Sequence, residues 1–265
     1  LRKKIGIIGY GNMGSAIAGR LKSRYRIFVF DKDQNKLTNL SDIYIAENVT
    51  GLLAQTDVLI LAVKPQDFEG VLNEIKGRIS DHLIISIAAG ITSKYIEKIL
   101  GAVRVIRVMP NIGAIVGRSI SYISKGALAD EKDLRLSAKL FSLLGYTFVI
   151  SEDLMNAATA VGGSGPGFWG YLSDKQSEEE WKAELTSAAK SVGFDEKTAL
   201  LTANYVTIAS KSATEALHIT PAELTEKVAS KGGTTEAGLE VLKNKGSLTD
   251  AVKAALKRAE ELSRG

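Results

Sequence analysis

The sequence contains no cysteine, which excludes several kinds of chemistry at once. Without a thiol the chain can form no disulfide bond, no thiolate zinc site and no cysteine nucleophile. Histidine is nearly as scarce, since His82 and His218 are the only two, too few for the usual histidine-based metal site. We therefore expect no bound metal and a chemistry that depends on other groups.

Long hydrophobic runs and blocks of like charge are also missing. No apolar run approaches the roughly 20 residues that a membrane span needs, so we expect no membrane partner. No signal-peptide pattern stands before the first apolar run, which favours a cytoplasmic location. With 34 basic and 30 acidic residues, and no Lys/Arg block with interleaved aromatics, the sequence predicts no nucleic-acid partner.

Close to its start the sequence has the pattern of a dinucleotide-binding turn. The short apolar run Ile5–Ile8 predicts a buried parallel strand, and Gly9-Tyr10-Gly11-Asn12-Met13-Gly14 follows it. The first glycine of such a turn makes a tight bend, the second lets the backbone approach a pyrophosphate, and the third lets helix and strand pack closely. The helix that begins here offers unpaired N–H groups to the anion. This stretch therefore predicts a nucleotide-binding site.

Further apolar runs follow, with helical segments between them. The expected strands are 26–31, 44–46, 57–63, 83–87 and 103–108. These runs end in small or polar residues, and the carboxyl ends of parallel strands are where such sheets bind ligands. The chain's 265 residues are enough for one large domain or two modest ones. We expect the first half to form a doubly wound α/β sheet with a ligand-binding edge.

Asp31 ends the second expected strand. It follows the glycine turn by about twenty residues, where an acid can hydrogen-bond the adenosine ribose hydroxyls of a dinucleotide. An aspartate there favours NADH over NADPH because it would repel a 2′-phosphate, although Lys32 beside it keeps NADPH possible. The alternative is a structural role, in which Asp31 caps a helix that begins near Lys32.

The pattern changes after residue 150. Before that point we expect a strand from residue 119, a helix over 130–143 and a strand over 146–150. From Ser151-Glu152-Asp153, which is typical of a capped helix start, the pattern is almost wholly helical. The sequence thus predicts a dinucleotide-binding domain over 1–150 and an all-helical domain over 151–265. Within the second, Gly162–Gly167 is too rich in glycine for a helix interior and predicts a break.

A second glycine-rich break, Ser230-Lys231-Gly232-Gly233-Thr234-Thr235, stands directly before an amphipathic segment over 236–242. Such a helix entrance can present several free N–H groups and two hydroxyls to an anion without any basic side chain. It could equally be a plain capped helix start. These residues alone leave both interpretations open.

Six segments, in order along nearly the whole chain, resemble the pyrroline-5-carboxylate reductase family of proline biosynthesis. They are Gly9–Gly14, Ala62–Gln66, Ser86–Gly90, Arg107–Asn111, Gly163–Pro166 and Gly232–Thr235. The resemblance implies NADH- or NADPH-dependent reduction of 1-pyrroline-5-carboxylate to L-proline. It also implies an N-terminal Rossmann domain and an all-helical C-terminal domain through which subunits form a homodimer or a larger assembly of dimers.

The resemblance implies roles for individual residues as well. The cofactor would be bound by Gly9, Gly11, Asn12, Met13, Gly14, Asp31, Asn48, Ala62, Val63, Lys64, Pro65, Met109, Pro110 and Asn111. The substrate carboxylate would be bound by Ser230, Gly232, Gly233, Thr234 and Thr235, and the Thr235 hydroxyl would hydrogen-bond the ring nitrogen. A protonated cyclic imine is already an electrophile, so a neutral hydroxyl that orients it is enough beside the nicotinamide.

The sequence departs from the family pattern at three places. Gly162-Gly163-Ser164 replaces the commoner Ser-Gly-Ser, which is a mild change. Lys231 stands where proline is usual, and the segment 173–185 is longer and more polar than expected. The extra length fits either added helical turns or a surface excursion. Two other functions stay open: a reductase of another imine or a 2-keto acid, in which Lys190 would be the candidate catalytic lysine, and a non-catalytic dinucleotide sensor. The sensor would have no reason to keep Gly232–Thr235.

Overall fold

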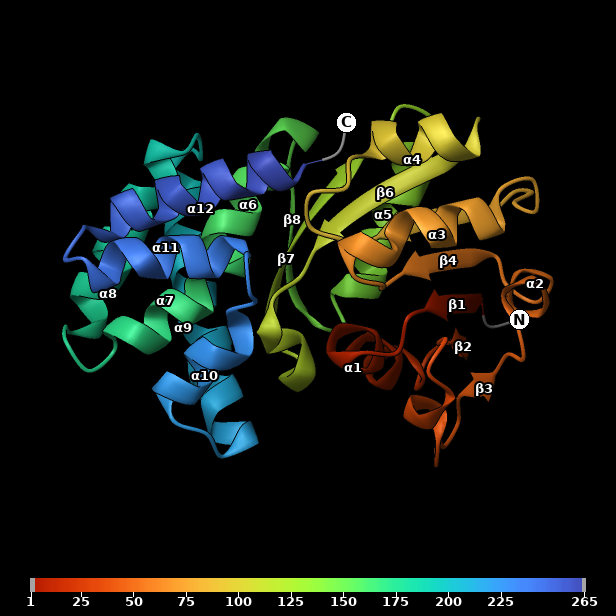
Figure 1. Cartoon of the computed structure of the whole chain (residues 1–265), viewed down its shortest axis with the longest axis horizontal. Helices are drawn as coiled ribbons and strands as arrows, with labels where there is room; N and C mark the ends of the chain where they lie inside the picture. Colours follow the sequence, from red (N-terminus) through yellow and green to blue (C-terminus); the bar gives the residue numbers. More distant parts are fainter. Residues whose placement is uncertain (1–2, 264–265) are drawn as a thin grey trace. The chain divides into compact units, whose positions relative to one another are not determined.

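The computed structural model describes residues 3–263, and its sheet has the order β3-β2-β1-β4-β5-β6-β7-β8 (Figure 1). The strands are β1 Lys4–Ile8, β2 Arg26–Phe30, β3 Tyr44–Ile45, β4 Val58–Leu61, β5 Leu83–Ser86, β6 Arg104–Met109, β7 Ser119–Lys125 and β8 Gly145–Val149. The pairings from β3 through β6 are all parallel. Since β1 pairs with both β2 and β4, the strand order reverses there, and doubly wound sheets bind nucleotides at this point. The expected α/β fold is confirmed.

Contacts between Cα atoms divide the chain into two compact units. The first comprises residues 3–108 and 123–143, and the second comprises 109–122 and 144–263. The units alternate along the chain, so they do not test a single boundary after residue 150, which stays a prediction. The second unit also takes in the segment Met109–Tyr122, which contains the end of β6 and the start of β7.

In the first unit, helices cover the sheet and complete its core. They are α1 Asn12–Leu21, η1 Gln34–Leu37, α2 Val49–Leu53, α3 Pro65–Ile75, α4 Ser93–Leu100 and α5 Glu131–Phe141. Figure 1 shows α3 and α4 lying across the visible face of the sheet. Phe68 and Leu72 of α3 and Ile96 of α4 are fully buried there, in one cluster with Ile8 and Leu61 of the strands. Alternate residues of each buried strand point to this face, as the period of two requires.

In the second unit, helices dominate. They are η2 Ile112–Val116, η3 Glu152–Leu154, α6 Met155–Ala158, η4 Thr159–Gly163, α7 Gly165–Leu172, α8 Glu178–Ser191, α9 Glu196–Leu217, α10 Pro221–Val228, α11 Thr234–Lys243 and α12 Leu248–Leu262. Ser151 stands before η3 but makes no capping hydrogen bond with its side chain, so that expected cap is wrong. Here the chain enters a short 3₁₀ turn rather than an α-helix, which leaves the hydroxyl without the usual cap geometry.

The glycines of 162–167 stand where regular α-helix is interrupted between α6 and α7, as the sequence predicts, although the backbone stays helical across the interruption. Residues Thr159–Gly163 form a π-helical turn, and α7 follows from Gly165. These glycines are contact points: a Cβ on Gly162 would overlap the Tyr122 ring, and one on Gly165 would lie 2.8 Å from a Val206 methyl. Close packing of neighbouring elements therefore overrides the low helix propensity of glycine here.

The segment 173–185 is neither a lengthened helix nor a surface excursion. Helix α7 ends at Leu172, and α8 begins after Ser177, whose side chain forms a reciprocal capping box with Glu180. Trp181 follows at once and is only 2% exposed, with its indole N–H donating to the Thr207 hydroxyl on α9 at 2.9 Å. The additional residues thus form a turn and a new helix that packs on α9 and α12.

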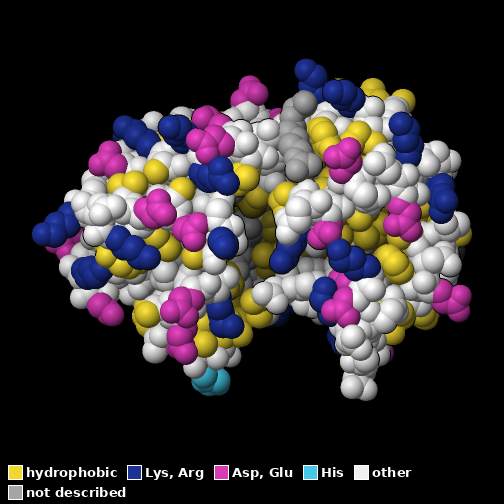
Figure 2. Space-filling view, viewed as in Figure 1, with side chains coloured by type: hydrophobic (Ala, Val, Ile, Leu, Met, Phe, Trp, Pro, Cys, Tyr) yellow, Lys and Arg dark blue, Asp and Glu magenta, His cyan; other side chains and the backbone are white. Residues whose placement is uncertain are grey.

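The surface is of mixed charge. Figure 2 shows Lys and Arg side chains interspersed with Asp and Glu over the visible face, without a large area of one sign. In the described residues, 3–263, no helix combines the length and the apolar character that crossing a membrane requires. Within the same residues, no three His, Asp or Glu side chains gather where they could hold a metal ion.

Candidate functional site

The glycine turn after β1 is sterically tight at Gly9 and Gly14 and open at Gly11. Gly9 has φ +99°, and a Cβ there would lie 2.6 Å from the Ala62 carbonyl oxygen, so the bend needs glycine. A Cβ on Gly14 would overlap the Gly9 carbonyl, which makes Gly14 the contact point between α1 and the turn. Gly11 differs, because nothing lies within 4 Å of its Cβ position. The open space stands at the N-terminus of α1, whose N-cap makes no side-chain hydrogen bond.

A pocket of about 690 Å³ lies beside this turn, within the first unit. Its lining includes the predicted cofactor residues Gly9, Gly11, Asp31, Ala62, Val63 and Lys64, together with Lys32 and Lys36. Ala62, Val63 and Lys64 directly follow β4, at the carboxyl edge of the sheet. The residues present therefore fit a dinucleotide, with the turn for its phosphates and the end of β2 for its ribose.

Asp31 is held firmly in this pocket. It is 6% exposed, and its carboxylate accepts the Tyr10 N–H at 2.7 Å, the Asp33 N–H at 2.9 Å and the Lys36 ammonium at 3.2 Å. Burial alone would raise the pKa of Asp31, but the two backbone N–H donors and Lys36 outweigh it and lower the pKa below its ordinary value. The N-cap of η1 is Asp33, so the alternative that Asp31 caps the next helix is wrong.

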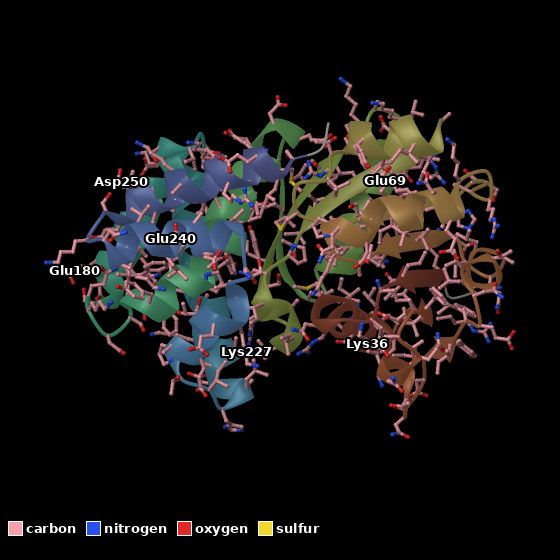
Figure 3. All side chains as sticks on the ribbon, in the orientation of Figure 1. Lys36, Glu69, Glu180, Lys227, Glu240 and Asp250 are labelled. Carbon is pink, nitrogen blue, oxygen red and sulfur yellow. The ribbon has the colours of Figure 1, made fainter. Side chains whose placement is uncertain are left out.

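Two cationic side chains stand beside Asp31, and one of them was missed in the sequence. Lys32 pairs with Asp67 at 2.7 Å, and Lys36, labelled in Figure 3, extends from η1 to Asp31. Lys36 lies five residues after Asp31 along an irregular turn, a spacing that carries no periodic signal. The end of the pocket beside Asp31 therefore holds both signs of charge.

Other predicted cofactor residues have clear structural roles. The Asn48 side chain accepts the Gly51 N–H at 2.8 Å and so caps α2. Pro65 occupies the first turn of α3, where a missing N–H costs nothing. Neither is among the residues that line the pocket in the described part of the chain. Asn12 and Met13 form the first turn of α1.

Asn111 holds together segments of the second unit. It is 3% exposed, its side-chain oxygen accepts the Gly113 N–H at 3.1 Å, and its side-chain nitrogen donates to the Gly162 carbonyl at 3.2 Å. The Met109 sulfur lies 3.9 Å from the Cβ position of Gly163. The segment Met109-Pro110-Asn111 therefore lies against the start of the 162–167 segment.

The turn before α11 lies against the same glycine segment. The Thr234 hydroxyl is 2.9 Å from the Ser164 hydroxyl, and a Cβ on Gly167 would lie 2.6 Å from the Thr235 methyl. Ser164 and Thr235 are 1% and 5% exposed. Three segments that are far apart in the sequence, Met109–Asn111, Gly162–Gly167 and Ser230–Thr235, thus form one continuous set of contacts.

The donors available in this turn differ from the sequence prediction. The Gly232 N–H donates to the Glu236 carboxylate at 2.6 Å, and the Gly233 N–H donates to the Ser230 carbonyl at 2.9 Å. Both are used within the turn. The first-turn N–H groups of α11, from Thr234 onward, have no carbonyl one turn earlier in the helix. Gly233 is the N-cap of α11 and makes no side-chain capping hydrogen bond.

A basic residue also contacts this turn, and the sequence did not predict this contact. The Arg258 side chain on α12 donates from Nε to the Gly232 carbonyl at 2.8 Å. Arg258 lies 26 residues further along the chain, and basic residues on an amphipathic helix are common, so no local pattern distinguishes it.

Comparison with known proteins gives a consistent result. The family model described as NADP oxidoreductase coenzyme F420-dependent matches residues 4–90, and the one described as pyrroline-5-carboxylate reductase dimerisation matches 152–262. A pyrroline-5-carboxylate reductase of Methanosarcina acetivorans is 36% identical, over 99% of this chain and 98% of its own.

Solved structures agree. A pyrroline-5-carboxylate reductase from Coxiella burnetii matches with a TM-score of 0.69 and 28% identity, over 100% of both chains. A pyrroline carboxylate reductase of Plasmodium falciparum with NADP bound matches with a TM-score of 0.65 and 26% identity, over 99% of this chain and 98% of its own. The resemblance found in the sequence is confirmed, and this chain belongs to the pyrroline-5-carboxylate reductase family.

Proposed function

We propose that this protein reduces 1-pyrroline-5-carboxylate to L-proline, with NADH or NADPH as the reductant. The observation that carries this proposal is the contact of the Ser230–Thr235 turn with Gly162–Gly167 and, through it, with Met109–Asn111. Family membership supports the same activity. The nicotinamide, when bound, supplies the hydride that adds to the imine carbon of the substrate.

The substrate carboxylate would be bound at the N-terminus of α11. The first-turn N–H groups from Thr234 onward are donors in a helix of 10 residues, whose dipole favours an anion at this end. Ser230, Gly232 and Gly233 would act by shaping this turn, since the N–H groups of the two glycines are already bonded within it.

Thr235 would hold the ring nitrogen. Its side chain is nearly buried, with the methyl against Gly167, which fixes the side chain beside the first turn of α11. A hydroxyl can accept a hydrogen bond from the protonated imine and from the amine that forms from it. Holding the ring in one orientation is the catalytic contribution that this group can make.

The cofactor would be bound mainly by the first unit. Its pyrophosphate would lie over Gly11 at the N-terminus of α1, near Gly9, Asn12, Met13 and Gly14. Its ribose would lie beside Asp31, with Ala62, Val63 and Lys64 along the carboxyl edge. We retain Asn48, Pro65, Met109, Pro110 and Asn111 as cofactor contacts in this proposal, although the contacts above give Asn48, Pro65 and Asn111 structural roles.

The proposal extends to assembly and location. The match to a dimerisation model over 152–262 supports a dimer formed through the helical part of the chain. We propose a homodimer, or a larger assembly of dimers, in the cytoplasm. The division into domains at 1–150 and 151–265 is part of the same proposal.

The alternative enzyme, a reductase with a catalytic lysine, finds little support at Lys190. This residue lies in the last turn of α8, its side chain is 49% exposed, and it is paired with Glu196. A lysine in an exposed ion pair lacks the burial that a catalytic lysine usually requires.

The test is the rate of NADH and NADPH oxidation by purified protein with 1-pyrroline-5-carboxylate, run beside 2-keto acids and other cyclic imines. We expect turnover with pyrroline-5-carboxylate well above that with the other substrates. Tight cofactor binding without turnover of any imine would support the non-catalytic sensor instead.

A further inference from the structure

The Gly232 peptide unit is held from two sides by charged side chains. Its N–H donates to the Glu236 carboxylate at 2.6 Å, and its carbonyl accepts from Arg258 Nε at 2.8 Å. Arg258 also forms an exposed ion pair with Glu261, which accepts from Nη1 at 3.0 Å. Glu236 belongs to α11 and Arg258 to α12, so the turn is fixed to both helices.

The position of Gly232 decides where the next residues point. Gly232 has φ +69°, a left-handed conformation that favours glycine, and the Gly233 N–H closes the turn onto Ser230. The first free donors of α11 follow directly, at Thr234 and Thr235. A rotation of the Gly232 peptide would therefore change the direction of the N–H groups and of the Thr235 hydroxyl together.

The residue before Gly232 does not restrain this turn. Lys231 has a free backbone φ, whereas a proline at that position would fix it. Hydrogen bonds to charged partners are stronger than those between neutral groups. The Gly232 peptide makes two such bonds, and they restrain its direction in a way that a lysine side chain in solvent does not. Arg258 and Glu236 therefore supply a restraint that the local sequence lacks.

We infer that Arg258 is a positioning residue for the substrate, acting through the Gly232 carbonyl to hold the carboxylate-binding turn in place. Its guanidinium also places a positive charge beside the turn, with Nη2 3.6 Å from the Cβ position of Gly232. This inference rests on the proposed function, because it assigns Arg258 to the substrate side of that reaction.

The variant that tests the inference is Arg258→Gln, with Glu261→Gln as the matched control. The control removes the outer ion pair of Arg258 and leaves its bond to Gly232. We expect Arg258→Gln to raise the KM for pyrroline-5-carboxylate and the Kd for L-proline by about tenfold, the effect of losing one charge-assisted hydrogen bond. The Kd for the nicotinamide cofactor should stay within about twofold, since that pocket lies in the first unit.

Two further measurements separate positioning from simple destabilisation. Hydrogen exchange of the Gly232 and Gly233 amides, which are bonded within the turn, should become faster in Arg258→Gln and stay unchanged in Glu261→Gln. Arg258→Lys, which keeps a charged donor, should recover part of the proline affinity. If Arg258→Gln does not fold, Glu236→Ala tests the other side of the same peptide and should weaken proline binding in the same direction.

The results distinguish this inference from the proposed function. If the wild-type protein turns over pyrroline-5-carboxylate and Arg258→Gln has an unchanged KM and proline affinity, the inference is overturned and the proposed function stands. Equal losses of cofactor and proline affinity would also overturn it, because they would indicate a general structural role. Absence of wild-type turnover would overturn the proposed function first.

Discussion

The Asp31 carboxylate accepts the Tyr10 backbone N–H at 2.7 Å, so the end of β2 is tied directly to the glycine turn that follows β1. Asp31 also accepts the Asp33 N–H and pairs with Lys36. An acid at this position usually hydrogen-bonds the ribose hydroxyls of a bound dinucleotide. In this chain the same carboxylate also organises the turn that binds the pyrophosphate in our proposal.

The first prediction concerns stability and pH. Because its hydrogen bonds lower the pKa of Asp31 in the folded state, Asp31 stabilises the fold above its ordinary, unfolded-state pKa of 3.8. This contribution is lost as the pH falls through the lower, folded-state pKa. Asp31→Asn should reduce the free energy of unfolding at neutral pH by about 1 kcal/mol, and the difference should shrink in acid. Urea unfolding at several pH values measures this, and a difference independent of pH would contradict it.

The second prediction concerns cofactor preference. Asp31→Ser removes the negative charge that repels a 2′-phosphate and frees the Lys36 ammonium from its ion pair. The ratio of kcat/KM for NADPH to that for NADH should therefore rise, by about tenfold if one unfavourable charge contact is removed. Parallel kinetics with both cofactors measure the ratio. An unchanged ratio would show that Asp31 does not contact the ribose of the cofactor.

The third prediction concerns Thr235. Thr235→Ala removes the hydroxyl but keeps the Cβ, so kcat/KM for pyrroline-5-carboxylate should fall by at least about tenfold while cofactor affinity changes little. Thr235→Ser keeps the hydroxyl and should retain much of the activity. Near-normal turnover in the alanine variant would show that the hydroxyl plays no part in the reaction.

The fourth prediction compares two neighbouring glycines. A Cβ on Gly162 overlaps the Tyr122 ring, so Gly162→Ala should destabilise the protein by about 1 to 3 kcal/mol. On Gly163 the nearest atom is the Thr159 methyl at 3.8 Å, an ordinary contact, so Gly163→Ala should leave stability equal or higher. Thermal unfolding of both variants is the measurement. Equal changes in stability in the two variants would show that the Tyr122 ring contact does not decide the outcome.

Local patterns in the sequence were enough to predict the first half of the fold. The turn at Gly9–Gly14 could be predicted because its glycine spacing stands between a short apolar strand and a helix. Gly9 and Gly14 each leave no room for a Cβ, and Gly11 faces open space. The carboxyl edge at Ala62–Lys64 followed from the regular spacing of the parallel strands.

Long-range contacts account for what the sequence did not reveal. The sequence predicts a helix break at Gly162 and Gly165. The small size of these glycines also makes room for Tyr122 and Val206, and this role could not be predicted because both partners are distant in the chain. Arg258 reaches Gly232 only because α12 packs on α11. In the Ser230–Thr235 turn, the N–H groups of Gly232 and Gly233 are occupied by Glu236 and Ser230. This arrangement depends on the three-dimensional path of the turn, which composition does not specify.

The most direct test of the central claim follows the hydride itself. Purified protein is incubated with 1-pyrroline-5-carboxylate and NADH or NADPH deuterated at nicotinamide C4, and the product is analysed by mass spectrometry and NMR. We predict L-proline with a single deuterium at C5, the former imine carbon, formed at the rate of cofactor oxidation. Cofactor oxidation without deuterated proline, or no turnover of this imine while another substrate is reduced, would contradict the account.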